Sequence, residues 1–174
     1  SRFLIYWSGV RISPGARTSE MKTVDYLGFA WTAAQCLGLA AVLGAGWHYG
    51  RPDGAAWISI AGGVIMTLSL LPAILGLRDL GTNLSPWPQP HATNELVTHG
   101  IYRRLRHPLY LSLILLAVGW AIWRQSWPSL LATAILLFIL RRKAAHEERL
   151  LGRRHACYSA YAQTTGCFWP RWRA

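Results

Sequence analysis

Charged side chains are scarce in this sequence of 174 residues. They make up 14% of the chain, whereas hydrophobic residues make up 52% and ten residues are Trp. An ordinary soluble domain carries a charge on about a quarter of its residues, so this composition argues against a water-soluble globule. The length provides for a single domain. The composition therefore indicates one domain that is embedded in lipid.

Two long stretches contain no charged residue. They cover residues 26–49 and 55–77, and each exceeds the ~20 residues that a helix needs to cross ~30 Å of hydrocarbon. Two shorter apolar stretches, 109–123 and 127–140, are joined only by the residues RQS. So tight a connection predicts an antiparallel helical pair. The sequence therefore predicts an all-α integral membrane fold with four transmembrane helices, over about 26–49, 55–77, 108–124 and 126–141, a cytoplasmic cofactor-binding loop and a C-terminal helical tail.

The basic residues alternate between rich and poor segments. Lys and Arg number four before residue 26, one between the first two spans, four over 78–107, one in the tight turn and eight from residue 141 onward. The positive-inside rule expects this alternation of four spans with both termini in the cytoplasm. A re-entrant hairpin would give the same count, but it would leave Arg124 near the bilayer centre at a cost of ~2.5 to 3.5 kcal/mol. We therefore expect spanning helices in an inner or cytoplasmic membrane.

The net charge of +11 raises the question of a polyanionic partner. Because this charge lies on one side of a membrane protein, orientation and contact with anionic headgroups explain it. We expect membrane lipids, and no nucleic acid, as partners. Cys36, Cys157 and Cys167 show no metal-binding spacing, and none lies on the predicted outer side. The sequence therefore predicts neither a metal site nor a disulfide.

The N-terminal residues have no clear place in this scheme. The first Met is Met21, and the residues before it contain neither a long apolar run nor a signal-peptide cleavage pattern. We expect residues 1–20 to be an upstream extension without a function. Residues 21–174 are then expected to form the single membrane domain.

The two basic cytoplasmic segments hold the candidate chemistry. One contains "LVTHGIYRRLRHPLY", in which Pro108 stands at the favoured first position of a helix. The other, "LRRKAAHEERLLGRRHACYSAYAQ", continues the fourth helix into water and contains Glu147 and Glu148, the only acids after Glu95. These acids could simply offset neighbouring bases, as Glu147 could offset Lys143. The joint occurrence of both segments favours a functional site.

These motifs, followed by "YSAY" and "FWP", resemble the isoprenylcysteine carboxyl methyltransferase and phospholipid methyltransferase family of integral-membrane enzymes. The upstream "RDLGTNLSP" is also similar, so the resemblance covers about residues 78–170. It implies methyl transfer that depends on S-adenosyl-L-methionine, with S-adenosyl-L-homocysteine as product, and without a Rossmann fold. The sequence agrees, because it contains no GxGxxG after a strand and no βαβ alternation.

The resemblance also implies which residues form the site. The cofactor would be held by Leu96, Val97, Tyr102, His107, Pro108, Leu109, Tyr110 and the acid pair, Glu147 first and Glu148 with it. Aligning the two Tyr of "YSAY" without a gap would instead place His146 and Glu147 opposite the acids of the family. An Arg one helical turn before Glu147 would hold the acidic group of the substrate. Arg142 is the nearest match, and Arg141 or Lys143 could take its place. The chain departs from the family pattern at Ile101, where Pro is frequent, and it lacks the aromatic-glycine pair that often follows the two acids.

The chemistry of the cofactor suits these side chains. A carboxylate such as Glu147 can accept protons from its ribose or amino group, and Tyr102 and Tyr110 can line the adenine or meet the sulfonium through cation–π contact. Unpaired backbone N–H groups at the start of the third helix, with Arg106 or His107 nearby, can donate to its carboxylate. His107 or His146 is a candidate base if the acceptor is a protonated amine or thiol.

The acceptor is expected to be lipophilic and to arrive from the bilayer at the cytoplasmic face. An isoprenylcysteine-like carboxylate, or another lipid or small-molecule carboxylate, amine or thiol, fits equally well. A non-catalytic membrane accessory or assembly protein of the same fold is the main alternative, although a scaffold would not require both motifs. A small transporter is less consistent, because the spans lack charged groups.

Overall fold

The fold is built from helices alone over the residues that can be described, 26–51, 53–81 and 96–171. In this computed structural model, these residues form five α-helices and one 3₁₀ turn, without a strand. The predicted all-α fold is therefore confirmed for them, while residues 1–20 and the proline-rich stretch 82–95 lie outside the described part. The elements are α1 Tyr26–Tyr49, α2 Ala56–Leu80, η3 Gly100–Arg103, α3 Pro108–Trp123, α4 Trp127–Arg154 and α5 Tyr158–Thr164.

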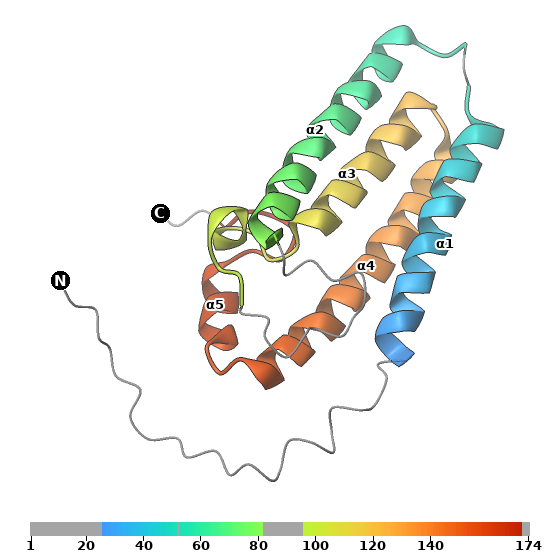
Figure 1. The fold of residues 1–174 in the computed structure, drawn as a ribbon. Helices are drawn as coiled ribbons and strands as arrows, with labels where there is room; N and C mark the ends of the chain where they lie inside the picture. The colour runs from blue at the N-terminus through green and yellow to red at the C-terminus, as the bar shows by residue number, and fades with distance from the viewer. Residues whose placement is uncertain (1–25, 52, 82–95, 172–174) are drawn as a thin grey trace, which may run out of the picture.

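Four long helices lie side by side in the order α2, α3, α4, α1 (Figure 1). α2 packs along α3, α1 packs along α4, and α3 and α4 meet in the centre. α1 and α2 are long and apolar enough to cross a membrane, and α3 is a shorter apolar helix of 16 residues. α4 continues for 14 residues beyond Leu140, the end of its apolar stretch, as the sequence predicted.

Small residues allow α2 and α3 to approach closely. A Cβ atom on Gly62 would overlap the backbone of Trp123, and one on Gly119 would overlap Met66. Farther along the same pair, a Cβ on Gly76 would press against the ring of Pro108. Close backbone approach of this kind is the usual role of small residues between membrane helices. It fixes the start of α3 against the last turns of α2.

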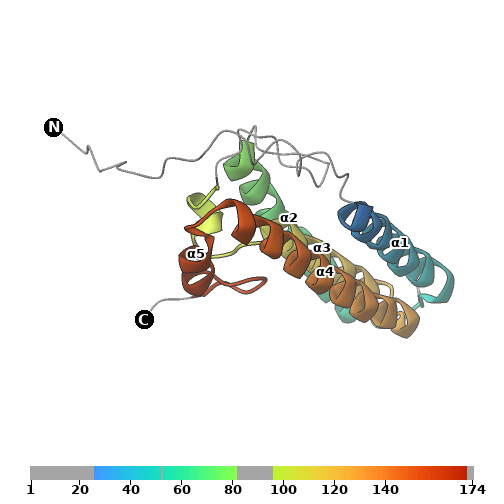
Figure 2. The same ribbon diagram turned by 90° about the horizontal axis from the view of Figure 1, so that it is seen from below.

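The buried core lies between α1, α3 and α4. Its members are Val42, Ala117, Leu136, Leu140, Ala144 and Phe168. Large apolar side chains such as Leu37, Ile60 and Phe138 point outward instead and are exposed. Phe168 follows α5, so the end of the described chain closes this core at one end of the bundle. Figure 2 shows α5 and the 3₁₀ turn together at that end.

At the opposite end, the α3–α4 turn bonds to the α1–α2 loop. The backbone N–H of Arg51 donates to the carbonyl of Arg124 (2.8 Å), and the side-chain amide of Gln125 donates to the carbonyl of Ala55 (3.0 Å). Gln125 adopts a φ of 49°, the left-handed conformation that so tight a turn requires. All four long helices therefore end at the same level here.

Candidate functional site

The last turn of α2 positions the chain that leads into α3. A carboxylate oxygen of Asp79 accepts a hydrogen bond from the N–H of Ile101 (2.6 Å). Gly100 has a φ of 57°, and a Cβ there would overlap the Asp79 carboxylate. Glycine is therefore required at this turn both by conformation and by space. Tyr102 follows, is buried, and places its hydroxyl 3.5 Å from the carbonyl of Gly76.

The residues after α5 pair with the stretch that precedes α3. The N–H of Arg106 donates to the carbonyl of Gly166 (2.8 Å), and the N–H of His107 donates to the carbonyl of Cys167 (3.2 Å). Both N–H groups are therefore already bonded, and they are not among the unpaired donors expected at the start of α3. Pro108 has no N–H, so the first-turn donors that α3 itself leaves without an intrahelical acceptor are those of Leu109 and Tyr110.

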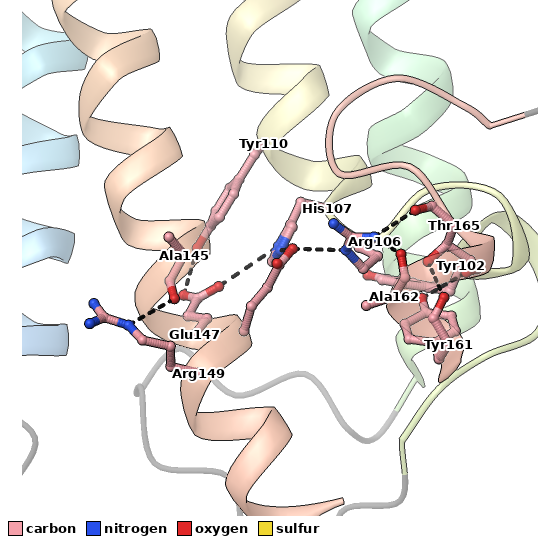
Figure 3. A network of polar contacts seen from close by, with 11 residues as sticks. Tyr102, Arg106, His107, Tyr110, Ala145, Glu147, Arg149, Tyr161, Ala162 and Thr165 are labelled. Carbon is pink, nitrogen blue, oxygen red and sulfur yellow. Dashed lines mark hydrogen bonds and ion pairs between the residues drawn. The ribbon is translucent and has the colours of Figure 1, made fainter. Parts of the chain in front are cut away.

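The imidazole of His107 lies between two neighbouring acids of α4. Its Nε2 is 3.2 Å from Oε1 of Glu148, and its Nδ1 is 3.8 Å from Oε2 of Glu147. Figure 3 shows the ring beside the carboxylate of Glu147. Successive residues on a helix point about 100° apart, so a group placed between them can face both. His107 therefore joins the start of α3 to both acids.

Arg106 forms the second link between these elements. Its Nε donates to Oε1 of Glu148 (2.8 Å), and its Nη1 donates to the carbonyls of Ala162 (2.7 Å) and Thr165 (2.5 Å). Burial alone would raise the pKa of Glu148, but the hydrogen bonds and charges of His107 and Arg106 outweigh it and hold this pKa at about 2. Glu148 is therefore an ionised carboxylate at neutral pH.

Glu147 contacts Tyr110, the aromatic residue that stacks on the His107 ring. It accepts a hydrogen bond from the Tyr110 hydroxyl (2.6 Å), and the rings of Tyr110 and His107 stack nearly parallel with centroids 5.2 Å apart. The Phe168 ring meets both edge-on. The side chain of Glu147 is 31% exposed, against 23% for that of Glu148. Glu147 is therefore the more accessible carboxylate.

Among the three basic residues that begin the tail, Lys143 faces the interior. Lys143 is only 8% exposed, and its Nζ donates to the side-chain carbonyl of Gln35 on α1 (2.8 Å) and lies 5.4 Å from the centre of the Tyr110 ring. Arg141 and Arg142 are exposed. The role predicted for Arg142 stays a prediction.

One comparison with known proteins identifies a family for this chain. A family model described as phospholipid methyltransferase matches residues 57–156. The chain belongs to this family. No curated protein matches it significantly. The matched region runs from α2 to the end of α4, so it contains His107, Tyr110 and both acids.

Membership of the phospholipid methyltransferase family confirms the resemblance seen in the sequence. It makes the protein a member of a family of membrane methyltransferases, for which S-adenosylmethionine is the general methyl donor. The matched region ends just before Tyr158, so the "YSAY" motif and the segment that pairs with Arg106 and His107 lie beyond the match.

The structure brings only part of the predicted set together. Arg106, His107, Tyr110, Glu147 and Glu148 form one network. Three other predicted residues pack against Gly76 of α2 and not in this network: Tyr102, Pro108 and Leu109. Leu96 and Val97 are half-buried in the irregular stretch ahead of Gly100. Their contact with a cofactor stays a prediction.

Several site residues were not predicted from the sequence. Asp79 was part of the recognised "RDLG" stretch, but its contact with Ile101 spans 22 residues. Gln35 carried a usable signal, because an amide inside an apolar span is uncommon and marks an internal contact. Phe168 belongs to the recognised "FWP" motif, but its aromatic contacts depend on the return of the chain after α5 and were not predicted.

His107, Glu148 and Cys167 place their donor atoms within 4.8 Å of one another, close enough to surround a metal ion. The guanidinium of Arg106 already supplies a positive charge to the same carboxylate oxygen of Glu148. Burial and the charge of Glu148 also raise the pKa of the Cys167 thiol to about 11, which disfavours the thiolate that metals prefer. The absence of a metal site stays a prediction. All three cysteines are free.

Proposed function

We propose that this protein transfers a methyl group from S-adenosyl-L-methionine to a lipophilic acceptor at the cytoplasmic face of a membrane, releasing S-adenosyl-L-homocysteine. One observation carries the proposal. The His107 ring lies between the carboxylates of Glu147 and Glu148, within the region that matches the phospholipid methyltransferase family. The same network includes an aromatic stack and the open end of a helix, which are the groups that this cofactor requires.

The residues present fit the cofactor. When bound, it supplies a methyl group on a positively charged sulfur. Glu147 has the more exposed carboxylate and can accept protons from the ribose or amino group, while Arg106 and His107 keep Glu148 ionised. The N–H groups of Leu109 and Tyr110 can donate to the carboxylate of the ligand. The Tyr110 ring can meet the adenine or the sulfonium.

The dimensions of the bundle support four spans. The basic residues over 78–107 and after residue 141 support both termini in the cytoplasm, in an inner or cytoplasmic membrane. All four long helices end together around Arg124, so a membrane that α1 and α2 cross would also contain the α3–α4 turn at its far side. Gln35 lies 14 residues before the end of α1 at Tyr49, which is about 21 Å along the axis. In a hydrocarbon layer of ~30 Å, the Gln35–Lys143 contact would lie below the headgroups, where an acceptor can enter from the bilayer.

The cation that faces the site indicates the chemical class of the methyl acceptor. A buried Lys143 beside Tyr110 supports an acceptor with an acidic group, such as an isoprenylcysteine-like carboxylate or another lipid or small-molecule carboxylate. Lys143 would then take the role predicted for Arg142. A carboxylate needs no base, because it is already a nucleophile. For an amine or a thiol, His107 or His146 would be the candidate base. In either case, the rate would come mainly from holding acceptor and sulfonium in line.

Calorimetric binding of S-adenosylhomocysteine to the protein in nanodiscs tests the proposal. We expect micromolar binding, which His107→Ala and Glu147→Ala each reduce at least a hundredfold while circular dichroism shows the helices retained. Asp53→Ala is the matched control, because it removes an exposed acid from the α1–α2 loop at the opposite end of the bundle. Its affinity should equal that of the unchanged protein.

Absence of binding in a folded sample would reject the proposal and favour the non-catalytic accessory protein. Binding that survives both substitutions would place the cofactor elsewhere. If binding is confirmed, a screen of lipophilic carboxylates, amines and thiols with radiolabelled methyl donor would identify the acceptor class.

A further inference from the structure

A charged contact joins α1 to α4 inside the bundle. Nζ of Lys143 on α4 donates to the side-chain carbonyl of Gln35 on α1 (2.8 Å), and Lys143 is only 8% exposed. Charged side chains below the headgroups are costly, and those that occur usually belong to a functional site. The family match begins at residue 57, after the end of α1. It therefore does not cover Gln35, which needs an explanation from this chain itself.

Packing of α1 against α4 does not require this charge. Along the same interface, neutral hydroxyl groups make the contact. The Ser129 hydroxyl donates to the carbonyl of Val42 (2.8 Å), and the Ser126 hydroxyl donates to the carbonyl of Ala45 (3.2 Å). Small polar groups of this kind are common links between membrane helices. A buried ammonium adds the cost of taking a charge out of water, so Lys143 serves more than the attachment of α1.

The groups that contact this ammonium among the described residues are neutral. They are the amide oxygen of Gln35 and the ring of Tyr110, whose centre lies 5.4 Å from Nζ. Glu147, one helical turn farther along α4, instead accepts a hydrogen bond from the Tyr110 hydroxyl (2.6 Å). An amide orients a cation without cancelling its charge, which a carboxylate in the same place would do. The charge of Lys143 is therefore able to attract an anion beside Tyr110.

We propose that Gln35 is a positioning residue that makes the acceptor site specific for a lipophilic acid. Its amide oxygen holds the Lys143 ammonium against the Tyr110 ring, and its lack of charge leaves the ammonium able to bind the carboxylate of the acceptor. This inference rests on the proposed function, because it takes the bound acid to be the methyl acceptor. The Tyr110 hydroxyl then contacts Glu147 on the cofactor side, while the Tyr110 ring contacts Lys143 on the acceptor side.

Photolabelling of the full chain in nanodiscs tests this inference without methyl transfer. The two probes are palmitic acid that bears a diazirine in its chain and the primary amine with the same chain, so that only the head group differs. We expect the acid to label peptides around Lys143 saturably. The amine should label them at least tenfold less at equal concentration, because like charges repel. Mass spectrometry of the labelled peptides gives the concentration of probe at half-saturation.

Two substitutions separate the charge of residue 35 from its hydrogen bond. Gln35→Glu keeps an oxygen that accepts from Lys143 but cancels the charge of the ammonium. The acid should then need about tenfold more probe for half-saturation, and labelling by the amine should rise. Gln35→Leu removes the hydrogen-bond acceptor without adding a charge, so the acid should bind about fivefold more weakly. A purely structural contact would leave Gln35→Glu unaffected and impair only Gln35→Leu.

Gln163→Glu is the matched control. It makes the same chemical change at an exposed position of α5, so its labelling by both probes should equal that of the unchanged protein. The affinity of both Gln35 variants for S-adenosylhomocysteine should stay within twofold of the unchanged value, because the change lies on the acceptor side of Tyr110. The unfolding midpoint of Gln35→Glu should not fall, since an ion pair replaces the hydrogen bond.

The remaining outcomes overturn the inference or the proposed function separately. Binding of the acid to Gln35→Glu or to Gln35→Leu as strong as to the unchanged protein would reject the inference, and so would equal labelling by acid and amine. If the unchanged protein binds S-adenosylhomocysteine but shows no saturable labelling by the acid, only the inference fails. If it binds no S-adenosylhomocysteine and labels as expected, the site for a lipophilic acid stands and the proposed methyl transfer fails.

Discussion

The two ends of the helix bundle use basic residues in different ways. At the α3–α4 turn, the guanidinium of Arg124 donates to the carbonyls of Gly46 (3.0 Å) and Trp47 (3.5 Å) at the end of α1. At the other end, Arg106 and His107 bond to the carboxylate of Glu148. The cation of the α3–α4 turn therefore pairs with backbone carbonyls, whereas the basic residues of the α5 end also pair with a carboxylate.

This difference indicates that the Arg124 end stabilises the fold, whereas the α5 end contains the groups that could carry out chemistry. The last carbonyls of a helix have no partner inside the helix and carry a partial negative charge, so a cation that caps them stabilises the fold. Those carbonyls are fixed by the backbone. The carboxylates of Glu147 and Glu148 can rotate and exchange partners, and Glu147 is partly exposed. The α5 end therefore contains carboxylates that can exchange their present partners for a ligand.

Loss of Arg106 should have the largest effect of any single substitution at either end. Arg106→Ala leaves Glu148 without its main partner and detaches the carbonyls of Ala162 and Thr165 from the start of α3. Removing one member of a buried ion pair typically costs about 3 to 5 kcal/mol, so we expect a free energy of unfolding lower by about that amount. Binding of S-adenosylhomocysteine should be lost as well. Chemical unfolding in detergent and calorimetry measure the two effects.

Arg106→Lys is the control for charge alone. An ammonium group lacks the planar fork that reaches a carboxylate and two carbonyls together, so Lys should recover only part of the stability. Full recovery by Lys would show that the charge, and not the shape of the guanidinium, holds the segment after α5.

Low pH should reduce the contribution of the α5 end to the free energy of unfolding and leave that of the Arg124 end unchanged. The pKa of Glu148 is lowered to about 2 in the folded protein, so its contribution is complete above the unfolded pKa of ~4.3 and is lost as pH falls toward 2. Each pKa unit corresponds to ~1.4 kcal/mol, so the loss is roughly 3 kcal/mol. Free energies of unfolding measured between pH 6 and pH 2 should show this loss in the unchanged protein and not in Glu148→Gln. Equal slopes for the two proteins would contradict the assignment.

The helices could be predicted from the sequence because their signals are local. Runs without charge located α1 and α2, and Pro108 located the start of α3 because proline suits the first position of a helix. The continuation of α4 past Leu140 followed from the tail pattern. The pairing of Arg106 and His107 with Gly166 and Cys167 was not predicted. It joins residues about 60 positions apart in a stretch without periodicity.

The candidate site was predictable in kind but not in detail. The motifs predicted His107, Tyr110 and the two acids as site residues, and in the structure these side chains contact one another. Sequence alone could not assign separate partners to Glu147 and Glu148, because neighbouring residues of a helix differ only in direction. That assignment depends on where the His107 ring lies between them. The same reason applies to Arg142 and Lys143, of which only Lys143 faces the interior.

Single substitutions of Lys143 and Arg142 test which of the two cations binds the acceptor. If the acceptor carries an acid, Lys143→Met should raise the KM for that acceptor about tenfold, the effect of losing one interaction between opposite charges. The affinity for S-adenosylhomocysteine should change less. Steady-state kinetics with the identified acceptor measure KM. A larger effect of Arg142→Met would instead support the role that the sequence predicted for Arg142, and equal small effects would remove both residues from acceptor binding.

The smallest effect is expected at the α3–α4 turn. Arg124→Ala removes a partly exposed guanidinium from the carbonyls of Gly46 and Trp47 and from its contacts with the Trp47 and Trp123 rings. A cation at a helix C-terminus contributes about 0.3 to 1 kcal/mol, so the free energy of unfolding should fall by about 1 kcal/mol. The affinity for S-adenosylhomocysteine should stay within twofold, because the network of His107 lies at the other end of α3. A large loss of affinity in a variant that is only slightly destabilised would show that the two ends are coupled along α3, and the separation of closure from chemistry would then be wrong.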